Sequence, residues 1–207
     1  MLNSGSCLTN TMNERYEPDD LKEALRVLKA GGIILYPTDT VWGIGCDATN
    51  EEAVQRIYSL KRRSDSKAML VLVDAPGRLQ AYVPEIPATA QTLLEHTEGE
   101  DARPLTIIYP DARNLAPSLL AEDGSIGIRI TEEHFTKALC AGLKKPVVST
   151  SANLSGEPAA GIFTDICSEI RDGVDYICRY RRNDRTCRKP SAVIKVNADN
   201  TFTIIRK

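Results

Sequence analysis

The chain has 207 residues and 42% hydrophobic residues, enough for one domain with a sizeable core. Its formal net charge of −2 gives no overall attraction to nucleic acid or to an anionic membrane. No apolar run approaches the roughly 20 residues that span a bilayer, and the start of the chain lacks the basic and apolar regions of a secretory signal. We therefore expect a cytoplasmic protein that does not insert into a membrane.

The hydrophobic pattern predicts helices and strands that alternate along most of the chain. The predicted helices are 20–29, 50–60, 78–83, 88–96, 132–143 and 164–170. The predicted strands are 33–36, 69–73, 105–109, 125–130, 146–149, 176–179, 192–196 and 202–205. Because the last third changes mainly to strands, joined at 197–200 by a turn, the pattern predicts a mixed sheet in an α/β fold.

A polar segment, residues 36–40, directly follows the apolar part of the first predicted strand. Pro37 removes a backbone donor and restricts the residue before it, so it should end the strand and expose Thr38 and Thr40. Such residues also form ordinary turns, and a simple turn is the alternative interpretation.

A cationic segment, residues 61–67, follows the helix predicted over 50–60. Cations at the carboxyl end of a helix suit its dipole, which is one explanation of the segment. However, four cations within seven residues repel one another, and only Asp65 offsets them. A polyphosphate ligand would supply the missing negative charge.

A third polar segment, residues 149–156, follows the strand predicted over 146–149. A buried strand that opens into a loop places hydroxyl and amide groups at the rim of the sheet, where open α/β sheets hold their ligands. The same residue types are common in helix caps and turns, so this segment alone does not decide between the two roles.

The cysteines and histidines do not occur in the patterns that metal sites and Ser-His-Asp or Cys-His catalytic sites require. The six cysteines contain no C-x-x-C pair, and there are only two histidines, so we expect neither a protein metal site nor a Ser-His-Asp or Cys-His catalytic group. We expect most cysteines to be reduced, while Cys178 and Cys187 would pair only in an oxidising setting.

Taken in this order, the three polar segments resemble the YrdC-like family of threonylcarbamoyl-AMP synthases over residues 21–206. Lys61 and Arg63 match the family's Lys-x-Arg signature, and Ser151 and Asn153 match its Ser-x-Asn signature. Further matches are Pro104-Leu105-Thr106, Ile126-Gly127-Ile128-Arg129, Pro190-Ser191-Ala192-Val193-Ile194 and Ile204-Ile205-Arg206. The chain departs from the family pattern at Ser64, Ala68-Met69, 100–104 and Ala192, which affects loops rather than the charged signature residues.

The resemblance implies a single YrdC-like catalytic domain over 19–207, with a twisted mixed α/β sheet around a large cavity, after an N-terminal extension, 1–18. It implies synthesis of L-threonylcarbamoyladenylate from L-threonine, bicarbonate and ATP, with release of pyrophosphate. Mg²⁺ would accompany ATP. This reaction is the first step in the threonylcarbamoyl modification of the tRNA adenosine next to the anticodon, so tRNA-modification proteins are expected partners.

The resemblance also implies roles for single residues. The implied catalytic residues are Lys61 and Arg63. The implied ATP-binding residues are Lys61, Arg63, Lys67, Ser151, Asn153 and Arg206, and the implied threonine-binding residues are Thr40, Arg129, Ser149 and Ser191, with Arg129 on the substrate carboxylate. No dedicated general base is evident in the sequence.

Two alternatives share the fold. An RNA-binding protein, including one that binds double-stranded RNA, would use the basic cavity without synthase activity, although aromatic residues for stacking make up only 5% of the chain. A carbamoyl-transfer module of hydrogenase maturation would carry an acylphosphatase unit and zinc-finger cysteines, which this sequence lacks. The basic segment 179–189 is either a solvated loop or a flap that meets a triphosphate or a tRNA backbone.

Overall fold

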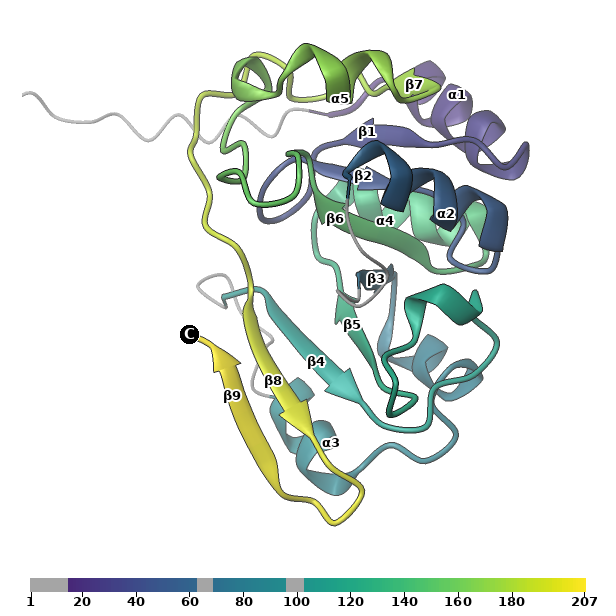
Figure 1. The fold of residues 1–207 in the computed structure, drawn as a ribbon, viewed down its shortest axis with the longest axis vertical. Coiled ribbons are helices and arrows are strands. Elements are labelled where there is room, and N and C mark those ends of the chain that lie inside the picture. The colour runs from purple at the N-terminus through teal and green to yellow at the C-terminus, as the bar shows by residue number, and fades with distance from the viewer. Residues whose placement is uncertain (1–14, 63–68, 96–102) are drawn as a thin grey trace, which may run out of the picture.

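The computed structural model describes residues 15–62, 69–95 and 103–207, and Figure 1 shows how their helices and strands are arranged. The α-helices are α1 (Pro18–Lys29), α2 (Glu51–Leu60), α3 (Ala88–Glu95), α4 (His134–Leu143) and α5 (Ser168–Asp172). Short 3-10 helices are η1 (Pro76–Ala81), η2 (Pro117–Leu119) and η3 (Phe163–Asp165). The strands are β1 (Ile34–Tyr36), β2 (Gly43–Gly45), β3 (Leu70–Val73), β4 (Leu105–Tyr109), β5 (Ile126–Ile130), β6 (Val147–Ser151), β7 (Tyr176–Ile177), β8 (Ala192–Val196) and β9 (Phe202–Arg206).

The strands of the described residues form one mixed sheet in the order β7-β1-β2-β6-β3-β5-β4-β8-β9. The pairs β1–β7, β3–β5 and β4–β8 are parallel, and the other neighbours are antiparallel. Strand β6 pairs with β2 on one side and with β3 on the other, so it joins the two halves of the sheet seen in Figure 1. The predicted mixed α/β sheet is confirmed.

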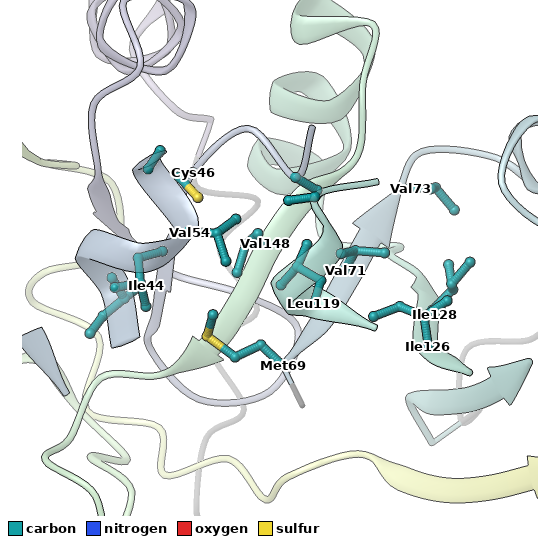
Figure 2. Close-up of a cluster of buried hydrophobic side chains, with 14 of the residues drawn as sticks. Ile44, Cys46, Val54, Met69, Val71, Val73, Leu119, Ile126, Ile128 and Val148 are labelled. Atoms are coloured by element: carbon teal, nitrogen blue, oxygen red, sulfur yellow. The ribbon is translucent and has the colours of Figure 1, made fainter. Parts of the chain in front are cut away.

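The central strands are buried on both faces. In β1, Ile34 and Tyr36 pack with α1 and α4, whereas Leu35 packs in the cluster that includes α2. The same alternation separates Val147 from Val148 in β6, as the period of two in a strand requires. Figure 2 shows part of the cluster that includes α2, where side chains from several strands and α2 meet. Strands of this kind can offer polar groups to a ligand only near their ends.

Helix α2 forms where its sequence predicts it. The side chain of Asn50 caps the helix by accepting a hydrogen bond from the backbone N–H of Ala53 at 3.1 Å. Ala53 and Ile57 are buried on the face toward the sheet. The helix ends at Leu60, and Lys61 is its C-cap residue. The cationic segment therefore begins where the helix ends, as predicted.

Strand β2 was not predicted, because glycine is a poor strand former and two of its three residues are glycine. The reason for Gly45 lies in the neighbouring strands. A Cβ atom at Gly45 would lie 2.4 Å from the carbonyl oxygen of Val148 in β6 and 2.7 Å from Cε1 of Tyr36 in β1. Only glycine lets β2 pass between these two strands.

Three other predicted elements differ in kind or extent. The helix predicted over 78–83 is the 3-10 helix η1, and the helix predicted over 164–170 is divided between η3 and α5. The strand predicted over 176–179 stops at Ile177. The remaining predicted elements agree with the structure to within about two residues at each end, which is the usual uncertainty of element boundaries.

The prediction that Thr38 and Thr40 are exposed was wrong. Strand β1 does end at Tyr36, but Thr38 and Thr40 are only 1% and 6% exposed. The Thr38 hydroxyl accepts a hydrogen bond from the Thr40 N–H at 3.0 Å and donates one to the Val41 carbonyl at 2.7 Å. Thr38 therefore shapes the turn, and the turn is covered by other parts of the protein.

The cysteines within the described ranges are free thiols. Cys178 and Cys187 are not paired: Cys178 is buried, whereas Cys187 is exposed. Burial raises the pKa of the Cys178 thiol well above its ordinary value. Within those same ranges, we find no helix with the length and apolar character needed to cross a membrane.

Replacing Gly45 by Ala should destabilise the fold, because the added methyl group would collide with backbone and ring atoms of two packed strands. We expect the free energy of unfolding, measured by urea denaturation, to fall by about 1–3 kcal/mol, the usual cost of overpacking. Gly77→Ala is the matched control, since nothing lies within 4 Å of a Cβ atom there. Equal unfolding midpoints for the two variants would contradict the crowding of β2.

Candidate active site

A cavity of about 380 Å³ lies against the sheet, and its wall takes residues from β2, β3, β4, β5, β6, β8 and β9. Its volume is within the range of small-molecule sites. The lining residues with hydrogen-bonding side chains are Thr40, Trp42, Thr106, Ser125, Arg129, Ser149, Thr150, Ser151, Ser191 and Arg206. The cavity therefore combines two cationic guanidinium groups with a set of neutral hydroxyls that can donate and accept hydrogen bonds.

Most of the predicted site residues that the structure describes lie on this wall. The residues predicted to bind threonine all line the cavity, and they are Thr40, Arg129, Ser149 and Ser191. Two residues predicted to bind ATP, Ser151 and Arg206, line it as well. Lys61 and Asn153 are not among the lining residues, and Arg63 and Lys67 lie outside the described residues. Segments from the first and the last part of the chain are brought together because β2 and β9 belong to the same sheet.

The Lys61 side chain is buried and holds the loop that follows β6. Its ammonium group donates hydrogen bonds to the carbonyl oxygens of Ser151 at 2.5 Å and Asn153 at 2.6 Å. In return, the backbone N–H of Ser155 donates to the Lys61 carbonyl at 3.0 Å. The Lys-x-Arg segment and the Ser-x-Asn segment are thus joined through Lys61. A contact of Lys61 with phosphate stays a prediction.

The Asn153 side chain also shapes this loop. Its amide nitrogen donates to the carbonyl oxygens of Leu154 at 2.9 Å and Glu157 at 2.6 Å. These bonds fold the loop back on itself directly after Ser151. Ser151 is the last residue of β6 and lines the cavity. The folded loop therefore helps to hold Ser151 in place on the cavity wall.

Arg129 carries a buried charge with few partners. Its side chain is 3% exposed, and its Nη2 lies 3.0 Å from Oδ1 of Asp39. Neither the Arg129 Nε nor the Asp39 Oδ1 has a hydrogen-bond partner, so the two groups form an ion pair without hydrogen-bond geometry. Buried polar atoms normally find a partner. An unpartnered guanidinium nitrogen on a residue of the cavity wall favours a polar ligand there.

Arg206 places a second guanidinium at the other side of the cavity. Its Nε donates to the Ser191 carbonyl at 2.9 Å, and the Ser191 hydroxyl lies 2.8 Å from that of Thr106. Burial lowers the pKa of Arg206, and the positive charges of Arg129 and Arg103 lower it further. The cations of the site therefore repel one another, and an anionic ligand would relieve this repulsion.

Asp39 and Thr106 were not predicted as site residues from the sequence. Both lie in segments that were noted, the polar segment 36–40 and the Pro104-Leu105-Thr106 match. Nothing local distinguishes Asp39 from a turn residue, because its partner Arg129 lies on β5, far along the chain. The signal for Thr106 was its place at the start of a strand, next in space to Ser191.

The basic segment 179–189 is tied to the protein at several points, which favours neither a freely solvated loop nor an untethered flap. Asp184 accepts from Arg181 at 3.0 Å and from Arg188 at 2.7 Å. Arg181 also donates to the Thr38 carbonyl at 3.0 Å, and Arg182 lies over the Phe163 ring. The Nε and Nη2 of Arg182 donate to the carbonyl oxygens of residues 178 and 177. The segment is thus fixed against the turn that carries Thr40.

Comparison with known proteins gives the family. The model of the Sua5, YciO and YrdC family, described as "Telomere recombination", matches residues 26–207. The chain belongs to this family. It is 36% identical over 140 residues to the threonylcarbamoyl-AMP synthase of Stutzerimonas stutzeri (strain A1501), and the match covers 68% of this chain and 74% of that protein.

Solved structures show the same fold. E. coli YciO matches with a TM-score of 0.80 at 23% identity, over 94% of this chain and 91% of that one. P. abyssi Sua5 complexed with L-threonine matches with a TM-score of 0.77 at 22% identity, over 88% of this chain. This chain spans about half the length of that Sua5 chain, 52%. Within the described ranges, we find no group of three or more His, Cys, Asp or Glu side chains placed to hold a metal ion.

Replacing Lys61 by Met should loosen the loop after β6, because two carbonyl oxygens lose their charged donor. We expect the free energy of unfolding to fall by about 1–3 kcal/mol and the amide hydrogens of residues 152–156 to exchange faster. Lys137→Met is the control, since Lys137 pairs with Glu132 on the surface and such pairs contribute little. Unchanged exchange in the loop of the Lys61 variant would show that this lysine does not hold it.

Proposed function

We propose that the chain is an L-threonylcarbamoyladenylate synthase that joins L-threonine, bicarbonate and ATP and releases pyrophosphate. The observation that carries this proposal is the Arg129 guanidinium, buried in the wall of the cavity with its Nε unpartnered. An amino-acid carboxylate is a fitting ligand for it, because a guanidinium pairs with a carboxylate through two parallel hydrogen bonds. Family membership and the related synthase support the same reaction.

Threonine would bind with its carboxylate on Arg129 and its side chain toward the hydroxyls of Thr40, Ser149 and Ser191. These residues line the same cavity and are each at most 6% exposed. The Thr40 and Ser191 hydroxyls pair with those of Thr38 and Thr106, and because a hydroxyl can both donate and accept, a substrate with a hydroxyl of its own is favoured over one without. The P. abyssi Sua5 structure with L-threonine supports this substrate in a protein of the same fold.

ATP would bind at the side of the cavity formed by the end of β6 and by Arg206. Ser151 would contact the nucleotide, and Lys61 and Asn153 would keep its loop in place. Arg63 and Lys67, with Lys61, are the proposed phosphate ligands. Mg²⁺ would enter with ATP, since it prefers phosphate oxygens and water to a cage of protein ligands. It would neutralise part of the phosphate charge.

The reaction brings several negative oxygens together. The threonine nitrogen first gains a carboxylate from bicarbonate, and water leaves. An oxygen of this N-carboxylate then bonds to the α-phosphorus of ATP while the bond to the bridging oxygen breaks and pyrophosphate leaves. The cations of the cavity would hold these groups in line and stabilise the charge that develops, which is the main source of catalysis in phosphoryl transfer.

The product would serve the threonylcarbamoyl modification of tRNA. We propose that partner proteins transfer the threonylcarbamoyl group from the adenylate to the tRNA, and that the chain works in the cytoplasm. An RNA contact by the basic segment 179–189 remains a proposal, supported by Arg179 and Arg185, whose guanidinium groups lie at the surface.

Pyrophosphate formation should require ATP, threonine and bicarbonate together, because the attacking oxygen exists only after the amine has gained its carboxylate. The measurement is pyrophosphate release from the purified protein with each substrate omitted in turn. Equal release with ATP alone would identify an ATP-hydrolysing enzyme and contradict the synthase.

Valine should be a poor substrate, because it matches threonine in shape but cannot make the hydrogen bonds that the substrate hydroxyl would make with the pocket. We expect kcat/KM for valine to lie at least about tenfold below that for threonine, since an unpaired buried polar group costs about 1–3 kcal/mol. Serine keeps the hydroxyl and loses a methyl group, so its kcat/KM should be roughly ten- to a hundredfold below that of threonine. Valine turning over as fast as threonine would mean that the pocket selects by size alone.

A further inference from the structure

The ion pair between Asp39 and Arg129 places a negative and a positive group next to each other, as the binding of a zwitterion requires. Asp39 lies in the turn between β1 and β2, next to Thr40, and its Oδ1 is 3.0 Å from the Arg129 Nη2. Both Thr40 and Arg129 line the cavity. An amino acid has its carboxylate and its ammonium on one carbon atom, so it can place the carboxylate on Arg129 and the ammonium beside Asp39.

The two side chains leave part of their hydrogen-bonding capacity unused, at a position next to the cavity-lining Thr40. The Asp39 Oδ1 and the Arg129 Nε are buried without hydrogen-bond partners, although the two side chains are in contact. A protein that needed this pair only for stability would gain from better hydrogen-bond geometry, because buried ion pairs stabilise only when their hydrogen bonds are made. The unmet bonds point to partners that the substrate supplies.

We propose that Asp39 binds the α-ammonium group of threonine and accepts the proton that this group must lose before its nitrogen can attack bicarbonate. This proposal deepens the proposed function and rests on it. It adds a catalytic residue to a site whose sequence showed no general base.

The chemical step is balanced with Asp39 as the acceptor. The threonine ammonium gives one proton to the Asp39 carboxylate, and the free amine forms a bond to the carbon of bicarbonate. One C–O bond of bicarbonate breaks, and its oxygen leaves as water together with the bicarbonate proton and a second proton from the nitrogen. The product is the N-carboxylate, with a single negative charge on its new carboxylate group.

The surroundings of Asp39 make it a better proton acceptor than an exposed carboxylate. Burial raises the pKa of the Asp39 carboxyl, and this effect outweighs the opposite effect of the guanidinium groups of Arg129 and Arg181. Glu132 adds a small further rise. A carboxylate with a raised pKa holds a transferred proton more firmly, which suits general base catalysis.

The test compares pyrophosphate release by the wild type and Asp39→Asn over a range of pH. Loss of a general base should lower kcat by about 10²-fold or more near neutral pH. The deficit should then shrink as the pH rises toward the pKa of threonine's own amine, because the free amine no longer needs the base. A deficit that stays constant across pH would show a role in positioning Arg129 only, and an unchanged kcat would show no role; either result overturns the proposal.

A competitor checks the contact with the ammonium separately. In 2,3-dihydroxybutanoate a hydroxyl replaces the ammonium of threonine. Its inhibition constant for the wild type should therefore be at least about tenfold higher than the dissociation constant of threonine, since hydrogen bonds to charged groups are the stronger ones. In Asp39→Asn this difference should disappear. A difference of the same size in both proteins would contradict the contact.

Controls separate the outcomes. Asp199→Asn changes an exposed carboxylate in the β8–β9 turn and should leave the rate unchanged at every pH. If Asp39→Asn does not fold, Asp39→Glu keeps a carboxylate and should show a lower rate with the pH dependence of the wild type; a changed pH dependence would overturn the proposal. A wild type that releases no pyrophosphate from the three substrates would contradict the synthase itself rather than the role of Asp39.

Discussion

A strand that is buried on both faces can present polar groups only where it ends, and the site depends on this constraint at β6. The strand lies between β2 and β3, with apolar clusters on either side. Its polar residues, Ser149 to Ser151, therefore come at its carboxyl end, on the cavity wall. Beyond that end the backbone carbonyls have no strand to pair with, and Lys61 supplies the donor that they need.

The second constraint is electrostatic. Arg129 and Arg206 line one cavity, and the only contact of Arg129 with an anion among the described residues is the imperfect pair with Asp39. The chain as a whole carries a formal net charge of −2, so these cavity cations are not part of a general excess of positive charge. A ligand rich in carboxylate and phosphate oxygens would balance this charge, whereas a neutral ligand would not.

Features set by neighbouring residues were predicted well. The helix over 50–60 and the strand over 33–36 were predicted from local spacing, and both are present in the structure as α2 and β1. Features set by distant partners were not. Strand β2 was missed because its need for glycine comes from Val148 and Tyr36 on other strands, and the exposure of Thr38 was misjudged because the segment 179–189 covers its turn.

By itself the sequence determined the mixed α/β fold, the positions of most elements and the residues that resemble a synthase site. Only the tertiary structure decided that Lys61 holds a loop, that Thr106 and Ser191 share a hydrogen bond, and that Asp39 stands beside Arg129. The physical reason is that local patterns fix backbone conformation and which face of an element is apolar. Contacts between residues far apart in the chain depend instead on strand order and register, and these emerge only when the whole sheet packs.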